Sequence, residues 1–262
     1  MDVKGRVVLI SGASSGIGAR LAVEIGRRGA RGVVLLARRQ EMLDEVAAEV
    51  RLTGAEALAI AADVGDDQSV VGAVARAQEH FGQLDVVVAN AGVGTRISPL
   101  EPNQAGLNHL TNINFLGAAR LIHAALPAML KRRQGQLVAV ASLAGYRGMP
   151  NGAAYCSAKA ALIALMESYR LELHEQGIGV STVLPGFVRT AMTEENDLEL
   201  PGAVTSEQAA RYIADGIERG QAEICFPFWT SLFMSWLKIW PNFIYDPIMQ
   251  MMLKRKAARR KK

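Results

Sequence analysis

The segment Y-C-S-A-K, residues 155–159, places a phenol and an ammonium group four residues apart. At the front of a helix this spacing puts Tyr155 and Lys159 on one face, one turn apart. A free tyrosine has a pKa near ~10 and is a poor proton shuttle at neutral pH, but a neighbouring cation favours phenolate and lowers that pKa. Tyr155 is therefore expected to act as an acid or base. The spacing also allows a buried ring beside a solvated lysine.

Ser142 supplies a hydroxyl to the same chemistry. It ends the apolar run Q-L-V-A-V-A-S, and the Tyr155 segment follows thirteen residues later. In open α/β sheets, ligands bind beyond the carboxyl ends of the strands. We therefore expect Ser142 and Tyr155 to meet in one crevice at a strand end.

A glycine-rich turn, S-G-A-S-S-G-I-G at residues 11–18, ends the first apolar run. Its glycines permit a tight turn, close approach of a pyrophosphate, and tight packing of the helix that follows, whose N-terminus favours an anion. The spacing G-x-x-x-G-x-G differs from the commoner dinucleotide fingerprint, and glycine is frequent in any turn. Its place between a first strand and a first helix nevertheless favours a dinucleotide site.

Arg38 and Arg39 follow the second apolar run, about where an acidic residue would hold a ribose with a free 2′-hydroxyl. A guanidinium matches a 2′-phosphate in charge and geometry, so the sequence favours NADP(H) over NAD(H). One of the two arginines is expected to begin a solvated helix instead, with Glu41 as a partner.

These residues need a parallel sheet to bring them together. Short apolar runs alternate with helical segments, and such alternation predicts strands covered on both faces and joined by right-handed crossovers. The fold class is α/β: one Rossmann-type, doubly wound parallel sheet of about seven strands over residues 1–226, with a C-terminal amphipathic helical extension. The runs that predict the strands are 7–11, 33–37, 57–62, 84–90, 136–142, 178–185 and 222–226.

Several motifs in order resemble the short-chain dehydrogenase/reductase family over roughly residues 4–226. They are the glycine-rich turn, D-V (63–64), N-A-G (90–92), I-N-F-L-G (113–117), Ser142, Y-C-S-A-K and P-G-F-V-R-T (185–190). Ser11 replaces the family's usual threonine, and Ser15 stands where some NADP-dependent members carry a basic residue.

The resemblance implies specific roles. Tyr155 would exchange a proton with the substrate oxygen, Ser142 would orient that oxygen, Lys159 would lower the tyrosine pKa and hold the nicotinamide ribose, and Asn114 would position a water. The NADP(H) contacts would be Gly12, Ser14, Ser15, Gly16, Ile17, Arg38, Arg39, Asp63, Val64, Asn90, Ala91, Gly92, Tyr155, Lys159, Pro185, Gly186, Val188 and Thr190. The family also implies a lid over the substrate pocket, here about residues 190–204, and a homodimer or homotetramer.

Composition narrows the class of protein. Two cysteines in 262 residues cannot build a disulfide framework, and four scattered histidines show no metal-ligand spacing, so we expect a reduced, cytoplasmic protein without a metal site. The N-terminus has no apolar run long enough for a signal peptide, so we do not expect export. The last nine residues, 254–262, hold seven basic groups and no acid, which predicts a solvated tail or a contact with an anionic partner.

All three tryptophans lie in residues 227–241, within an apolar extension at 227–253. A transmembrane helix needs ~20 apolar residues, whereas Pro227, Pro241 and Pro247 are expected to divide this region into shorter pieces. Residues 228–240 form an amphipathic helix with an aromatic face. That face could pack on the chain's own helices or another subunit, lie on an anionic membrane together with the basic tail, or extend the substrate pocket.

The sequence thus predicts an NADP(H)-dependent oxidoreductase that interconverts a ketone and a secondary alcohol on a hydrophobic or lipid-like substrate. By analogy with the family, that substrate would be of the 3-oxoacyl, keto-sphingoid, steroid or retinoid type. The protein would be cytoplasmic, with residues 228–262 as the site of peripheral contact with a membrane. The tail has no aromatic residues for base stacking, which disfavours nucleic acid. A non-catalytic, NADP-sensing scaffold at a membrane is the alternative.

Overall fold

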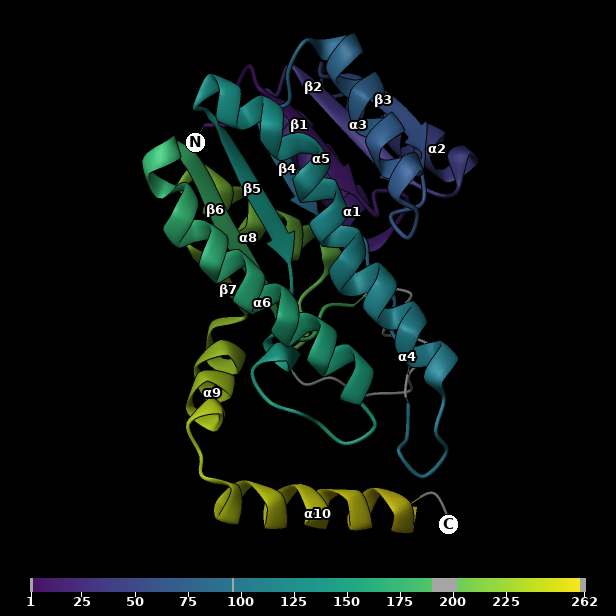
Figure 1. The fold of residues 1–262 in the computed structure, drawn as a ribbon, viewed down its shortest axis with the longest axis vertical. Helices are drawn as coiled ribbons and strands as arrows, with labels where there is room; N and C mark the ends of the chain where they lie inside the picture. The colour runs from purple at the N-terminus through teal and green to yellow at the C-terminus, as the bar shows by residue number, and fades with distance from the viewer. Residues whose placement is uncertain (1, 96, 190–201, 260–262) are drawn as a thin grey trace.

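The computed structural model of the chain describes residues 2–95, 97–189 and 202–259. A seven-stranded parallel sheet in the order β3-β2-β1-β4-β5-β6-β7 forms its centre (Figure 1). The strands are β1 (Val7–Ser11), β2 (Gly32–Ala37), β3 (Glu56–Ala61), β4 (Val86–Ala89), β5 (Gly135–Val140), β6 (Ile178–Pro185) and β7 (Glu223–Phe226). The predicted fold class is confirmed, and the predicted strand bounds shift by a residue or two.

Helices cover both faces of the sheet and form two apolar cores with it. One layer contains α1 (Gly16–Arg27), α2 (Gln40–Arg51) and α8 (Ser206–Glu218), and the other contains α3 (Asp67–Phe81), α5 (Gly117–Arg132) and α6 (Ala153–Leu173). On the second layer, α4 (Gln104–Thr111) continues into α5 through the π-helical turn η1 (Asn112–Leu116). The 3₁₀ turns are η2 (Leu143–Gly145) and η3 (His174–Gln176).

The central strands are mostly apolar because neither of their faces meets water, and their polar residues Ser11 and Gln136 are buried with the rest. Every residue of β1, β4 and β5 is buried, as the unbroken apolar runs predict. Parallel pairing also brings the carboxyl ends of all the strands to one edge. The strand order reverses between β1 and β4, and in open α/β sheets ligands bind beyond the strand ends at such a switch point.

One continuous helical stretch, Gln104–Arg132, is long and apolar enough to cross a membrane by length and composition. It is the combined α4, η1 and α5, and 44% of its most apolar window is buried in the protein. The core cluster around Leu121 and Ile122 shows that this stretch packs on the sheet. It is therefore a core helix, and core helices of soluble proteins pass the same test.

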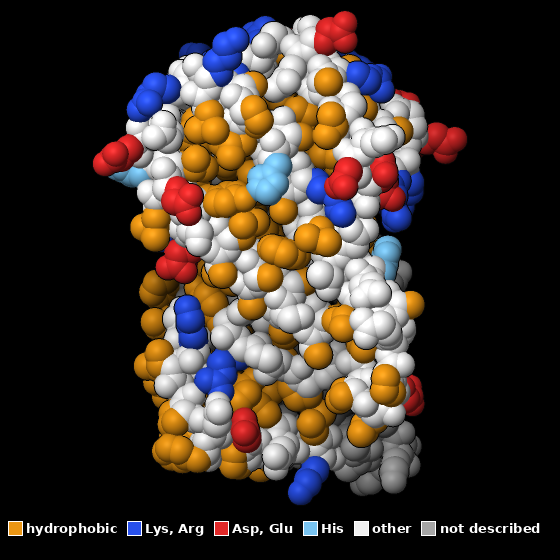
Figure 2. Space-filling model, in the orientation of Figure 1, with side chains coloured by type: hydrophobic (Ala, Val, Ile, Leu, Met, Phe, Trp, Pro, Cys, Tyr) orange, Lys and Arg blue, Asp and Glu red, His pale blue; other side chains and the backbone are white. Residues whose placement is uncertain are grey.

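Helix α9 (Phe228–Lys238) follows β7 and turns its aromatic face outward. Trp229 is 76% exposed, whereas Ser231 on the polar face is only 8% exposed. The exposed apolar side chains of α9 and of the residues just after it are Phe228, Trp229, Leu232, Phe233, Trp236, Ile239, Phe243 and Ile244, here called the aromatic surface. Figure 2 shows hydrophobic side chains along the side of the molecule that α9 forms. If this face packed on the chain's own helices, its side chains would be buried. In the described part of the chain only Leu237 of this face is buried, so that alternative is ruled out.

Helix α10 (Asn242–Arg259) corrects one expectation. Pro247 does not divide the region, because the helix runs through it. A proline there removes a bond to the carbonyl of Phe243, which lies in an exposed first turn where water can replace that bond. The first residues of the basic tail, as far as Arg259, continue the same helix.

Candidate active site

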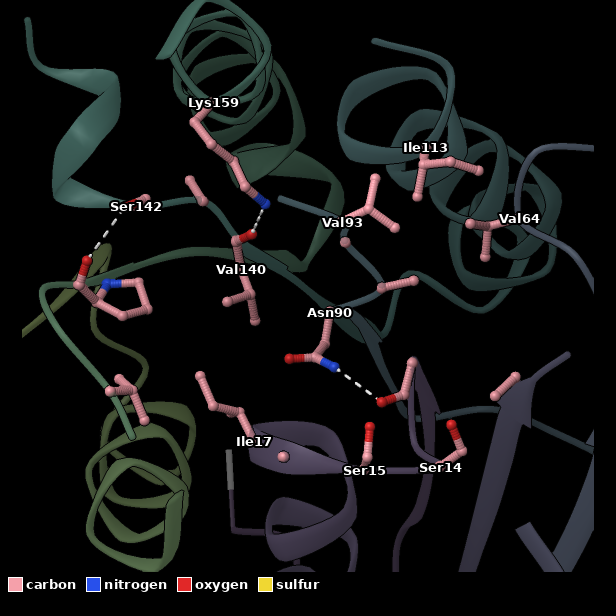
Figure 3. Close-up of a pocket in the computed structure, with 18 of the residues that line it drawn as sticks. Ser14, Ser15, Ile17, Val64, Asn90, Val93, Ile113, Val140, Ser142 and Lys159 are labelled. Atoms are coloured by element: carbon pink, nitrogen blue, oxygen red, sulfur yellow. Dashed lines mark hydrogen bonds between the residues drawn. The ribbon is translucent and has the colours of Figure 1, made fainter. Parts of the chain in front are cut away.

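A cavity of about 310 Å³ opens at the carboxyl edge of the sheet (Figure 3). The predicted cofactor residues that line it are Gly12, Ser14, Ser15, Gly16, Ile17, Arg38, Arg39, Asp63, Val64, Asn90, Ala91, Gly92, Tyr155, Lys159, Pro185, Gly186 and Val188. Ser142 lines the same cavity, so the structure brings the predicted proton-transfer groups and the predicted cofactor groups together. Thr190 and the predicted lid as far as residue 201 lie outside the described residues.

Sequence reasoning missed six further lining residues: Ala37, Ala62, Val93, Ile113, Val140 and Ala141. Four of them are small or β-branched residues at or just beyond strand ends, and the remaining two directly adjoin predicted positions. A rule that counts the last residue of each strand, and the neighbours of each motif, would have found most of them. Among the described residues, no group of three His, Cys, Asp or Glu side chains is placed to hold a metal ion.

The glycine-rich turn forms one wall because its glycines allow contacts that a side chain would block. Gly12 has φ +66°, and a Cβ atom on it would lie 2.8 Å from Ala91 Cα. A Cβ atom on Gly18 would lie 2.3 Å from the Gly12 carbonyl oxygen. Helix α1 then begins at Gly16 with no acidic residue in its first turn. The exposed N–H groups and the close backbone approach fit a pyrophosphate.

Asn90 and Ser11 tie this turn to the end of β4. The Asn90 side-chain amide donates to the Ser11 carbonyl at 2.9 Å and to the Gly12 carbonyl at 3.3 Å, and the second of these bonds is drawn in Figure 3. The Ser11 hydroxyl accepts from the backbone N–H groups of Asn90 at 3.0 Å and Ala91 at 3.1 Å. Serine at position 11 therefore supplies the hydroxyl bonds between the two loops without the methyl group of a threonine.

Arg38 and Arg39 lie at the end of β2, beside the glycine-rich turn. The Arg39 guanidinium donates to the Ser14 hydroxyl at 3.2 Å, which holds it over the cavity rim. Both arginines are exposed, and neither forms an ion pair within the described ranges of the chain; the expected partnership with Glu41 is absent there. Two cations without a carboxylate partner fit a phosphate group at this rim.

Ser142 and Tyr155 meet as predicted. Ser142 follows β5, where its hydroxyl accepts from the Ala144 N–H at 3.1 Å and donates to the Pro185 carbonyl at 3.3 Å. Tyr155 lies in the first turn of α6 and lines the same cavity as Ser142. Burial raises the pKa of Tyr155, and the Ser142 hydroxyl only partly opposes that effect.

Lys159 differs from expectation in where its charge points. Its ammonium donates to the Val140 carbonyl at 2.7 Å, and the nitrogen lies 5.8 Å from the centre of the Tyr155 ring (Figure 3). Burial is the largest cause of the raised tyrosine pKa, and the lowering of that pKa by Lys159 stays a prediction. Burial also lowers the pKa of Lys159 itself to about 8.

Asn114 is fully buried in the π-helical turn η1. Its amide nitrogen donates to the Val93 carbonyl at 2.8 Å, and its amide oxygen accepts from the Val93 N–H at 2.8 Å. The side chain therefore fixes the loop after β4, and its role in positioning a water stays a prediction. Single π-helical turns often occur at functional sites, because the extra residue redirects a side chain without ending the helix.

Comparison with known proteins places this geometry in a family. The short chain dehydrogenase family model matches residues 6–200. The chain is 35% identical over 245 residues to an uncharacterized oxidoreductase of Myxococcus xanthus, covering 94% of this chain and 96% of that protein. It is 37% identical over 254 residues to the 11-beta-hydroxysteroid dehydrogenase-like protein 4A of Arabidopsis thaliana, covering 90% and 80%.

A solved structure agrees with these sequence matches. The short-chain dehydrogenase from Sphingobium yanoikuyae in complex with NADPH superposes with a TM-score of 0.78 at 28% identity. The match covers 88% of this chain and 93% of that protein. Both the sheet and the edge that carries the cavity are therefore shared with a family structure that holds a nicotinamide dinucleotide.

Lys159 generates a prediction about stability and pH. Because its pKa falls from 10.5 to about 8 on folding, the buried charge opposes folding fully below pH 8, and this penalty shrinks as the pH rises to 10.5. Replacing Lys159→Met should therefore raise the free energy of unfolding at pH 7 by about 1–3 kcal/mol while removing activity. Denaturant unfolding at pH 7, 9 and 10.5 measures the effect, which should decline along this series.

Lys131→Met is the matched control, because Lys131 is exposed on the surface of α5. It should change stability little at any of these pH values. A Lys159→Met protein that is less stable than the wild type at pH 7 would show that the bond to Val140 outweighs the cost of burying the charge.

Proposed function

The chain belongs to the short-chain dehydrogenase family, and from that membership we propose that it uses NADP(H) to interconvert a ketone and a secondary alcohol on a hydrophobic substrate. The observation that carries this proposal is the meeting of Ser142, Tyr155 and Lys159 on one wall of the cavity that the glycine-rich turn closes. NADP(H), when bound, supplies or accepts the hydride. The chain's own residues bind, orient and exchange the proton.

Tyr155 acts as the proton donor in ketone reduction. Its raised pKa keeps the phenol protonated at neutral pH, which is the form that can donate to a substrate oxygen. Ser142, which lines the same cavity, holds the same oxygen through its hydroxyl. Lys159 holds the nicotinamide ribose and keeps positive charge near the phenol as its proton leaves. Alcohol oxidation requires the phenolate and is favoured as the pH rises.

We expect Tyr155→Phe to abolish turnover and to leave NADPH binding intact, since only the hydroxyl is lost. Fluorescence titration with NADPH and an assay across ketones of graded chain length measure the two properties. Substantial remaining turnover would exclude Tyr155 as the proton donor. A wild-type protein that binds NADPH and turns over no ketone or alcohol would instead favour a non-catalytic, NADP-sensing scaffold.

The arginine pair at the end of β2 selects NADP(H) in this proposal. Arg39, held by Ser14, is placed to bind the 2′-phosphate, and Arg38 adds charge to the same rim. A charge-assisted bond contributes about 1.5–3 kcal/mol, so Arg39→Asp and Arg38→Asp should each raise the KM for NADPH by about 10- to 100-fold. The KM for NADH should change little.

Steady-state kinetics with both coenzymes measure this preference. Arg76→Asp, on the exposed surface of α3, removes an equal charge away from the cavity and serves as the control. If neither variant at the rim changes the ratio of NADPH to NADH efficiency, the arginines are only part of the surface of α2.

A hydrophobic substrate is supported by a similar protein and by the aromatic surface. One relative is described as 11-beta-hydroxysteroid dehydrogenase-like, a name that denotes an apolar ring ketone or alcohol. Helix α9, which carries the aromatic surface, follows the carboxyl end of β7 (Figure 1), and the cavity is lined by residues at the carboxyl ends of the neighbouring strands. A subunit pair through α5 and α6 is also part of the proposal, since Leu130 and Leu171 are exposed there.

The partner that we propose for the aromatic surface is the cytoplasmic face of an anionic membrane. Tryptophan is favoured at headgroup depth, and α10 continues from this surface into the basic run that starts at Lys254. Apolar area together with a basic segment supplies the two contributions that stable peripheral binding needs.

Co-sedimentation with vesicles of phosphatidylcholine and phosphatidylserine tests the membrane contact. Trp229→Ser together with Trp236→Ser should weaken binding by about 10-fold or more, because both side chains are largely exposed and would enter the lipid. Leu52→Ser, at an even more exposed apolar position just after α2, should change nothing. If the wild type does not bind vesicles, and the double tryptophan variant is monomeric where the wild type is a dimer, the aromatic surface is a subunit interface.

A further inference from the structure

Arg147 joins the C-terminal helices to the active-site loop. It lies between η2 and α6, in the segment that connects Ser142 to Tyr155. Its guanidinium donates to the backbone carbonyls of Trp240 at 2.7 Å and Lys238 at 3.3 Å, and to the Asn242 side chain at 3.1 Å. One side chain thus closes the end of α9 and binds the first residue of α10.

Tyr245 completes the junction from the side of α10. Its ring lies under the Arg147 guanidinium at 4.1 Å, its hydroxyl donates to the Gly148 carbonyl at 2.7 Å, and it is 6% exposed. Nearby, the Lys238 ammonium lies 4.7 Å from the centre of the Tyr146 ring. Ser235 on α9 lies close enough to the Tyr146 hydroxyl to oppose the rise of its pKa that burial causes. Three consecutive residues of the loop, 146–148, therefore hold the extension.

The extension also touches the other side of the cavity. A Cβ atom on Gly186, which lines the cavity after β6, would lie 3.0 Å from the Thr230 methyl group of α9. Helix α9 therefore contacts the loops after both β5 and β6. These contacts come from its polar face, so the aromatic surface remains on the opposite, outer side.

We propose that Arg147 is a positioning residue that couples the lipid contact of the aromatic surface to the loop between Ser142 and Tyr155. The inference rests on the proposed membrane contact and extends it. Lipid binding reduces the motion of α9 and α10, and through the bonds of Arg147 it also reduces the motion of the loop between Ser142 and Tyr155, beside the cavity. The wild type on a vesicle therefore binds hydrophobic ketones more tightly, with a lower KM and an unchanged kcat.

Arginine suits this role because its planar fork reaches several acceptors at once. Lysine keeps the charge, but its three N–H donors share one nitrogen, so it cannot reach two carbonyls and an amide oxygen in the arrangement that the two guanidinium nitrogens reach. Methionine keeps much of the length and removes every donor. Arg147→Met should therefore uncouple the loop, and Arg147→Lys should restore only part of the coupling.

Hydrogen–deuterium exchange of the full-length protein, with and without phosphatidylcholine–phosphatidylserine vesicles, tests the coupling. In the wild type, vesicles should slow exchange about threefold or more in residues 228–245 and in 143–152. In Arg147→Met the protection of 228–245 should remain, and that of 143–152 should be lost. Arg76→Met, an exposed arginine on α3, is the matched control and should behave as the wild type.

Three outcomes would overturn the coupling. Equal protection of 143–152 in Arg147→Met would show that another contact transmits order, and an unchanged loop in a vesicle-bound wild type would show that none does. A wild type that binds no vesicles would remove the membrane contact and the coupling together. Ketone turnover, measured without vesicles on the same samples, tests the catalytic proposal separately from all three.

Discussion

The close approach of the turn after β1 to the end of β4 is the constraint on which the site depends. Gly12 must pass within contact distance of Ala91, and the Asn90 amide and Ser11 hydroxyl hold the two loops at that distance. Any side chain at Gly12 or Gly18 would push them apart. The position of α1, and with it the anion-binding end of the cavity, follows from this contact. Asn114 is a second, separate anchor of the β4 loop, because its amide bonds to both backbone groups of Val93.

Much of this arrangement could be predicted from the sequence because the relevant signals are local and repeated. Buried parallel strands need unbroken apolar runs, and parallel pairing sends the residues that follow those runs to one edge. Ser142, Tyr155 and the glycine-rich turn could therefore be placed together without coordinates. The direction of the Lys159 ammonium could not, because a spacing of four fixes the helix face and leaves a flexible side chain free to choose the Val140 carbonyl over the phenol.

The C-terminal extension shows a second limit of sequence patterns. Periodicity gave α9 an aromatic face and a polar face, but an amphipathic pattern does not say which face meets the protein. Here the polar face finds specific partners in Tyr146 and Arg147, and the apolar face is left outside. The sequence also does not show that a helix runs through Pro247. The free-energy cost of a proline inside a helix depends on whether the carbonyl that it leaves unpaired can reach water, and in the exposed first turns of α10 it can.

The outward aromatic surface also affects how the purified protein behaves in a test tube. The eight large apolar side chains of the aromatic surface will bind any amphiphile that is present or associate with the same surface of another molecule. The apparent size of the particle in aqueous buffer is then a mass-action result, set by detergent and protein concentration together. A gel-filtration profile taken without a defined amphiphile would report the competition for this surface as well as the pairing of the folded domains.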